Sequence, residues 1–313
     1  MRFVREGGRV SAEQIEGRGA SGDGFCPSPD EGELRDRLRE ARAHAEGDPG
    51  EGLSLVASLC HELAWDLLEE GLLSDAEALV REELAAVRFL AANDPETFLP
   101  RVADACENLA GILWEGGDPA EAEPLYREAL SLRRSLAGQD PAEGPLSEVA
   151  SSCVDLALFL EDLGRLEEAE PLLREALGTY RSLRGGHALS WAAMVARTGF
   201  VLARVLDCAG RPEEAEPLLR EALGCYRSLA AADPGEDGLP ALIPEAGSPM
   251  GALATILAEG GRVGEAEELF RGGLSMYAIL SEAHPEREDF RLGEEAFRDG
   301  LAQLSDTTIT HAS

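Results

Sequence analysis

The stretch Asp118–Pro141, DPAEAEPLYREALSLRRSLAGQDP, decides the fold, because near-copies of its centre recur along most of the chain. EAEPLLREAL stands at Glu168–Leu177 and again at Glu214–Leu223. Looser copies are DAEALVREEL at Asp75–Leu84 and EAEELFRGGL at Glu265–Leu274. Self-similarity at a fixed period is typical of repeat architectures. The chain is therefore expected to be an array of one structural unit.

The alanine of each copy sets the register of this array. It is residue 76, 122, 169, 215 or 266, so the spacings are 46, 47, 46 and 51. A Leu-Ala pair lies 13 and 12 residues before each of them: Leu63-Ala64, Leu109-Ala110, Leu156-Ala157, Leu202-Ala203 and Leu253-Ala254. Around each pair, apolar or small residues follow the i, i+3, i+4, i+7 spacing of one helix face. Each unit is therefore predicted to begin with a helix that carries this pair.

A glycine turn separates that helix from the repeated motif in every unit: Gly71, Gly116-Gly117, Gly164, Gly210 and Gly260-Gly261. After one of these turns, Asp118 offers a capping oxygen and Pro119 suits the first turn of a second helix. Two helices per unit are therefore predicted. Between Asp233 and Pro249 the connection is longer than its counterparts, and we expect a loop without regular structure there.

The composition is strongly acidic, with 28 basic and 60 acidic residues and a formal net charge of -32. Such a surface repels phosphate backbones and anionic lipid, so neither nucleic acid nor membrane is expected as a partner. No apolar run reaches the roughly 18 residues of a membrane span, and the N-terminus MRFVREGGRV lacks the apolar segment of a signal peptide. A cytoplasmic location is expected. Every basic residue is Arg, which with abundant Ala, Gly and Leu suggests a GC-rich bacterial genome.

The two ends of the chain differ from its middle. Residues 1–30 show no apolar period and are predicted to be disordered. A helix at 31–46 and a last helix after Pro285 each have one apolar face, as the capping helices of an array need. The solenoid is therefore predicted over residues 31–304, followed by a disordered tail at 305–313.

The pattern NLAxxLxxxGxxxEAExLYREAL, at Asn108–Leu130, resembles tetratricopeptide repeats of the kinesin-light-chain-like type. LAANDPETFLP, at Leu90–Pro100, resembles the linkers of long actinobacterial tetratricopeptide arrays. The resemblance covers roughly residues 31–304 and implies an all-α, right-handed α-solenoid of about five helix pairs with a capping helix at each end. HEAT and armadillo repeats, which have a similar period, are the alternative. The 12-residue step from a small residue to the motif alanine across a glycine turn favours tetratricopeptide repeats.

The resemblance also implies a concave groove, lined by the positions 15, 11 and 8 residues before each motif alanine. Tryptophans at such positions either pack into the core or form an exposed apolar floor for a peptide, with Arg197 and Arg204 available to a carboxylate. The family often has Asn before the Leu-Ala pair, and here only Asn108 matches. The expected peptide-binding residues on the concave face are His61, Trp65, Glu107, Asn108, Trp114, Arg197, Phe200 and Arg204.

Motifs for catalysis or metal binding are missing from the sequence. His61-Glu62 begins like the zinc motif HExxH, but Trp65 stands where the second His is needed. Glu and Arg four residues apart recur on the second helices, and we interpret them as surface ion pairs rather than as an anion-binding ladder. Cys60, Cys106 and Cys153 occupy the same position in successive repeats. We expect them to be free thiols in the core, too far apart to form disulfides. No catalytic residue, metal or cofactor is predicted.

The sequence therefore favours a non-catalytic protein–protein interaction scaffold that binds a peptide or protein segment. A second hypothesis is a ligand- or peptide-responsive regulatory module that acts on a separate effector chain. An enzyme with an unrecognised site is the third. No DNA-binding helix-turn-helix motif is found, so an effector of the second kind would have to be another protein.

Overall fold

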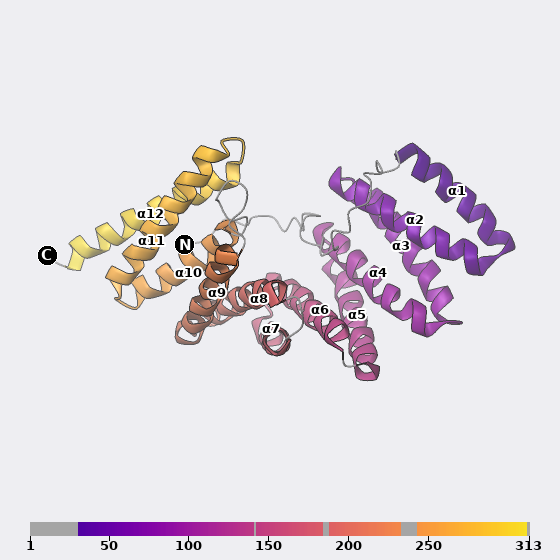
Figure 1. Cartoon of the computed structure of the whole chain (residues 1–313), viewed down its shortest axis with the longest axis horizontal. Coiled ribbons are helices and arrows are strands. Elements are labelled where there is room, and N and C mark those ends of the chain that lie inside the picture. The colour runs from indigo at the N-terminus through magenta and orange to yellow at the C-terminus, as the bar shows by residue number, and fades with distance from the viewer. Residues whose placement is uncertain (1–30, 141, 184–187, 233–242, 312–313) are drawn as a thin grey trace. The chain divides into compact units, whose positions relative to one another are not determined.

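The computed structural model describes residues 31–140, 142–183, 188–232 and 243–311. These residues form α-helices joined by short connections, and no strand occurs among them (Figure 1). The helices are α1 (Glu31–Gly47), α2 (Pro49–Glu69), α3 (Leu73–Ala91), α4 (Pro95–Glu115), α5 (Pro119–Gln139), α6 (Glu143–Asp162), α7 (Leu166–Ser182), α8 (Ala188–Cys208), α9 (Pro212–Ala232), α10 (Ile243–Glu259), α11 (Val263–Ala283) and α12 (Glu288–His311). The all-α prediction is confirmed.

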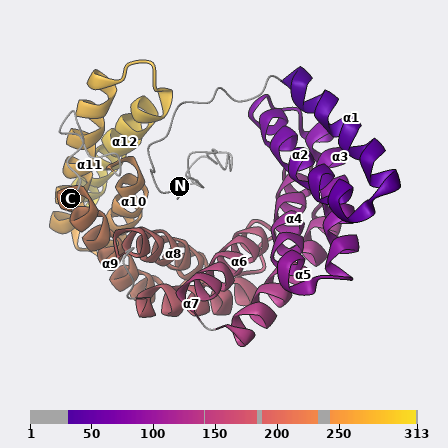
Figure 2. The same ribbon diagram turned by 45° about the vertical axis from the view of Figure 1, so that its right-hand side comes forward.

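The chain divides into two compact units, Met1–Leu132 and Arg133–Ser313, and the boundary lies inside α5. In unit 1, α1 packs against α2, α2 against α3 and α3 against α4, and in unit 2 each helix from α6 to α12 packs against the next one in the sequence. In unit 1, α2 and α4 lie in one layer, with α1 and α3 in the other (Figure 2). In unit 2, α6, α8 and α10 lie in one layer, and α7, α9 and α11 lie in the other. We call α2, α4, α6, α8 and α10 the first helices, and the layer they form within a unit its first-helix layer.

Each helix pair is joined by the same turn, which contains one glycine with positive φ: Gly71, Gly117, Gly164, Gly210 or Gly261. In the turn between α6 and α7, Arg165 N–H donates to Leu160 O at 2.8 Å and Gly164 N–H donates to Glu161 O at 2.8 Å. These two bonds define a Schellman motif, which satisfies the last carbonyls of the first helix. The predicted glycine turns are therefore confirmed. Glycine occupies this position because the left-handed conformation that the motif needs strains any residue with a Cβ.

The core of each repeat lies where its two helices meet. The motif alanines are fully buried at 0 % exposure: Ala76, Ala122, Ala169, Ala215 and Ala266. Every member of the five Leu-Ala pairs is at most 2 % exposed. Cys60, Cys106 and Cys153 are free thiols in this core, and burial raises the pKa of each to about 12. The register derived from the sequence is therefore correct.

Two predicted boundaries are corrected by the structure. α10 begins at Ile243, inside the stretch 233–249 that we expected to be a loop. Pro244 is compatible with this start, because the N–H groups of a first helical turn have no partner within the helix. α12 continues to His311, so residues 305–311 of the expected disordered tail are helical; they contain no Gly or Pro that would end the helix. The predicted disorder at 1–30 and 312–313 lies outside the described residues.

One stretch among the described residues, Leu189–Cys208 in α8, is long and apolar enough to cross a membrane by length and composition alone. Half of it is buried inside the structure, and α8 packs against both α7 and α9. The stretch also carries Arg197, Arg204 and Asp207. A core helix of a helical repeat passes the same test, and the packing of α8 explains its apolar composition.

Candidate binding face on the first helices

In unit 1, the predicted groove positions are all half-buried: His61, Trp65 and Leu68 on α2, and Glu107, Gly111 and Trp114 on α4. Asn108 is half-buried as well. The sequence left open whether the two tryptophans pack in the core or face outward. In the structure, each indole is partly packed and partly exposed. The first-helix layer of unit 1 therefore presents two aromatic side chains that are already partly held in place.

Trp65 belongs to a chain of polar contacts that runs from the surface into the core. Its indole Nε1–H donates to Nε2 of His61 at 3.0 Å, and the two rings meet edge to face at a centroid distance of 6.1 Å. Nδ1 of His61 lies 3.3 Å from Oε1 of Glu83 on α3. Because Nε2 accepts a hydrogen bond, the proton of the neutral imidazole is on Nδ1 and faces the carboxylate.

Glu83, which sequence reasoning missed, is the buried end of this chain. It is only 3 % exposed, and its Oε2 has no hydrogen-bond partner among the described residues. The equivalent residue in every other repeat is small: Ala129, Ala176, Ala222 or Gly273. A buried carboxylate is costly unless it is paired, and the partner that the structure shows is His61. The signal in the sequence was REEL at 81–84, where three other copies read REAL.

The charges around His61 favour its protonated form. The hydrogen bond with Glu83 raises the pKa of His61 above its ordinary value, while burial acts in the opposite direction. From α4, Asp104 adds to the increase and Arg101 reduces it. The electrostatic environment of the imidazole is therefore set by side chains of two other helices, α3 and α4.

In unit 2, the predicted site residues lie on α8. Arg197 and Phe200 are half-buried, whereas Arg204 is exposed. The Arg204 guanidinium lies 5.7 Å from the ring centroid of Phe200 and donates to both carboxylate oxygens of Glu161 on α6, at 2.6 and 2.5 Å. Arg204 therefore already has a carboxylate partner, which differs from our expectation. No ion pair joins Arg197 to a carboxylate in the part of the chain that the structure describes.

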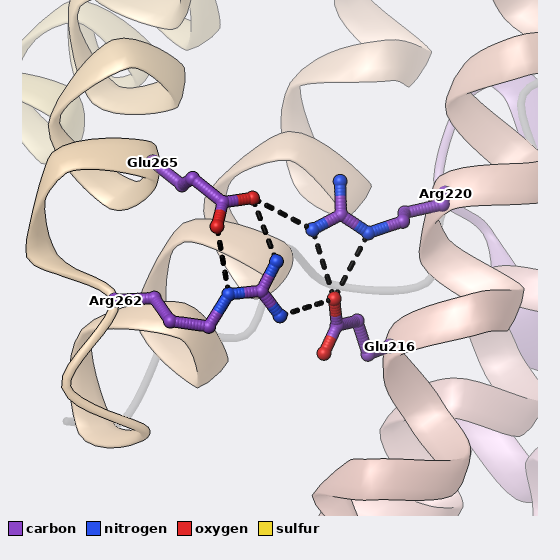
Figure 3. Close-up of polar contacts among 4 residues, drawn as sticks. All are labelled: Glu216, Arg220, Arg262 and Glu265. Atoms are coloured by element: carbon purple, nitrogen blue, oxygen red, sulfur yellow. Dashed lines mark hydrogen bonds and ion pairs between the residues drawn. The ribbon is translucent and has the colours of Figure 1, made fainter.

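The Glu–Arg pairs on the second helices form, and they also link neighbouring repeats. Glu216 and Arg220 on α9 meet Arg262 and Glu265 at the start of α11 in a closed ring (Figure 3). Arg220 is 2.8 Å from Glu216 and 3.1 Å from Glu265, and Arg262 is 2.7 Å from each of them. A second ring joins α7 to α9 and consists of Glu170, Arg174, Arg211 and Glu214.

Each arginine of these rings lies between two carboxylates, so it is not available to an outside anion. The hydrogen bonds from Arg220 and Arg262 lower the pKa of Glu216. The alternative of an anion-binding ladder finds no support in this arrangement. The links between repeats were missed, although an Arg followed by a Glu 40 residues later recurs: Arg42–Glu82, Arg81–Glu121, Arg88–Glu128, Arg174–Glu214 and Arg181–Glu221.

Comparisons with known proteins place this arrangement in context. Family models described as tetratricopeptide repeat match residues 102–143 and 148–228. No curated protein sequence matches the chain. Among the described residues, no group of three or more His, Cys, Asp or Glu side chains could hold a metal ion.

Several solved structures are similar over most of the chain. BtubC (BKLC) from P. vanneervenii has a TM-score of 0.62 at 22 % identity and covers 80 % of this chain and 91 % of its own. A putative kinesin light chain from Podosopora anserina with nearly identical TPR-like repeats has a TM-score of 0.52 at 22 % identity, over 73 % of this chain and 97 % of its own. A Rap protein complexed with competence and sporulation factor reaches 0.53 at 15 % identity, over 91 % and 77 %. At these identities the likeness shows the fold.

Proposed function

Because this chain is a tetratricopeptide-repeat protein with kinesin-light-chain-like repeats, we propose that it is a non-catalytic scaffold that binds a peptide or protein segment on its first-helix layer. The fold supports a protein–protein interaction scaffold in general, since stacked helix pairs present an extended surface on which such proteins bind their partners. Beyond this general role, we propose that the first-helix layer is the binding surface and that named side chains on it contact the partner. The proposal places the first contact in unit 1.

The observation that carries the proposal is the pair of half-buried tryptophans, Trp65 on α2 and Trp114 on α4. Tryptophan is the residue most enriched among binding hot spots, together with Tyr and Arg. A ring that is partly packed before binding loses less conformational freedom when a partner covers it. Both indoles therefore suit the role of anchors for apolar side chains of a partner.

The charge of the chain narrows the kind of partner. With a net charge of -32, the molecule attracts basic segments over a long range and repels acidic ones. The rings of arginine and glutamate lie on the second helices, where their cations are already paired. We therefore propose a segment that combines basic side chains with one or two large apolar ones.

Peptide selection from a random displayed library, with the full chain as the target, supplies a defined probe. Fluorescence anisotropy then compares the wild type with the Trp65→Ala/Trp114→Ala variant. We expect the double variant to bind at least about 30-fold more weakly, which corresponds to the 2 kcal/mol or more of hot-spot truncations. Circular dichroism should show unchanged helicity.

Phe89→Ala is the matched control, because Phe89 is a large aromatic residue on the second helix α3 and is 52 % exposed. It removes an exposed ring from a second helix and leaves both tryptophans in place, so binding should stay near the wild-type level. Equal losses in the control and the double variant would place the binding site elsewhere. A library that yields no binder would also count against the proposal.

A further inference from the structure

We propose that His61, positioned by Glu83, controls whether the indole of Trp65 is available to a partner: the neutral imidazole holds the indole, and the imidazolium releases it. Binding on the first-helix layer of unit 1 then depends on pH. The inference deepens the proposed function and rests on it only in its final step, because Trp65 belongs to the proposed binding face. The switch itself is a property of the free chain.

The mechanism follows from the hydrogen-bonding capacity of the imidazole ring. In the neutral ring, Nδ1–H faces Glu83 Oε1 at 3.3 Å, and the lone pair of Nε2 accepts the Trp65 N–H at 3.0 Å. Acidification adds a proton from solvent to Nε2, so both ring nitrogens become donors. The Trp65 N–H is also a donor and cannot accept a hydrogen bond. Two donors cannot share a hydrogen bond, and the contact between the rings must open.

Glu83 moves this switch to a higher pH than an isolated histidine would give. Its carboxylate is buried at a position where other repeats have Ala or Gly, so the protein retains a charge where a small apolar residue would fit. This charge lies beside Nδ1 and stabilises the imidazolium. From α4, Asp104 supports the protonated form and Arg101 opposes it, and the sum raises the pKa of His61. The transition is therefore expected above pH 6.5, which is about the ordinary value for histidine.

The released groups indicate the chemistry of the partner. After protonation, Nε2–H of His61 and Nε1–H of Trp65 both need an acceptor, and the His61 side chain is 42 % exposed. Glu83 and Asp104 make the surroundings acidic, so a neutral acceptor is favoured over a carboxylate. A backbone carbonyl oxygen of the bound segment meets this requirement. We therefore expect tighter binding below the transition than above it.

Nuclear magnetic resonance of the free chain tests the switch without any partner. The chain has three tryptophans, so three indole N–H signals are expected and can be assigned with single Trp→Phe variants. The Trp65 signal should shift in one transition whose midpoint equals that of the His61 ring nitrogens. The signal of Trp114 should not follow this transition.

Two variants on α3 separate the role of Glu83 from a general effect of charge. Glu83→Ala introduces the residue that other repeats bury at this position, and it should lower the midpoint by about one to three pH units. Glu82→Gln is the matched control, since the neighbouring Glu82 carries the same charge but pairs with Arg42. Its midpoint should remain close to the wild-type value. If Glu83→Ala does not fold, Glu83→Gln removes the charge at constant volume.

The inference is overturned if the Trp65 signal stays constant while His61 titrates, or if both variants shift the midpoint equally. The final step uses the peptide selected above as the probe, at one pH below and one pH above the midpoint that magnetic resonance gives for His61. We expect about three- to tenfold tighter binding at the lower pH, the effect of one hydrogen bond, and no such difference in Glu83→Ala. A pH-independent affinity in the wild type would overturn control of binding. A library without binders would count against the proposed function alone, because the magnetic resonance test stands by itself.

Discussion

Replacing Gly164 with Ala and, separately, Gly178 with Ala tests the repeated turn on which the register depends. A Cβ added at either residue would meet nothing within 4 Å, so neither substitution introduces a steric clash with a neighbour. The two sites differ in backbone conformation alone. Gly164 has a φ of +73° in the turn between α6 and α7, whereas Gly178 is an exposed residue inside α7.

The free energies of unfolding should therefore move in opposite directions. Inside a helix, Ala is more favourable than Gly by about 0.5–1 kcal/mol, so Gly178→Ala should stabilise the chain by that amount. The left-handed conformation costs an L-residue about 1–2 kcal/mol. The gain of Gly178→Ala arises largely because Ala restricts the unfolded chain, by about 0.4–1 kcal/mol, and Gly164→Ala receives this gain too. Gly164→Ala should thus be destabilising, and the two variants should differ by about 1–2 kcal/mol, the cost of the left-handed conformation.

Native-state hydrogen exchange of the α6 and α7 amides is the appropriate assay, because a repeat array does not have to unfold in one step. Circular dichroism before exchange checks that both variants keep the helical content of the wild type. Stabilisation by both substitutions would refute the reasoning, since it would mean that Gly164 does not occupy a left-handed conformation. Equal destabilisation would place Gly178 outside a helix.

Four further outcomes are expected from the packing and the charges. Ala157→Leu should overpack the contact between α6 and α7 and cost about 1–3 kcal/mol in urea unfolding, and a wild-type transition would show that the register is wrong. A thiol reagent at about pH 8 should label exposed Cys208 and spare Cys153, whose pKa burial raises to about 12, until the chain unfolds. Arg262→Ala should destabilise the chain more at low than at high salt concentration, and equal losses would mean that its ion pairs contribute nothing. Since the folded state lowers the pKa of Glu216, the contribution of this carboxylate should be present above about pH 4.5 and be lost as the pH falls, in an acid titration monitored by circular dichroism.

Helix boundaries could be predicted only in part. The glycine turns were found because the Schellman motif leaves a local mark at each C-terminus, such as Gly164. The start of α10 at Ile243 and the end of α12 at His311 leave no comparable mark. A helix end without a strong cap depends on what its last turns pack against, and this information is not local.

The sequence by itself determined the repeat, its register, the glycine turns and the buried thiols, because each repeat contacts mainly its neighbours and a linear pattern therefore maps directly onto the stack. It also pointed to His61 and Trp65 as residues of one helix face. Only the tertiary structure decided what these side chains contact. Glu83 reaches His61 from another helix, and Glu161 reaches Arg204 from 43 residues away. Such partners depend on how helices cross and which rotamers their side chains adopt, and the periodicity of a single helix carries no information about either.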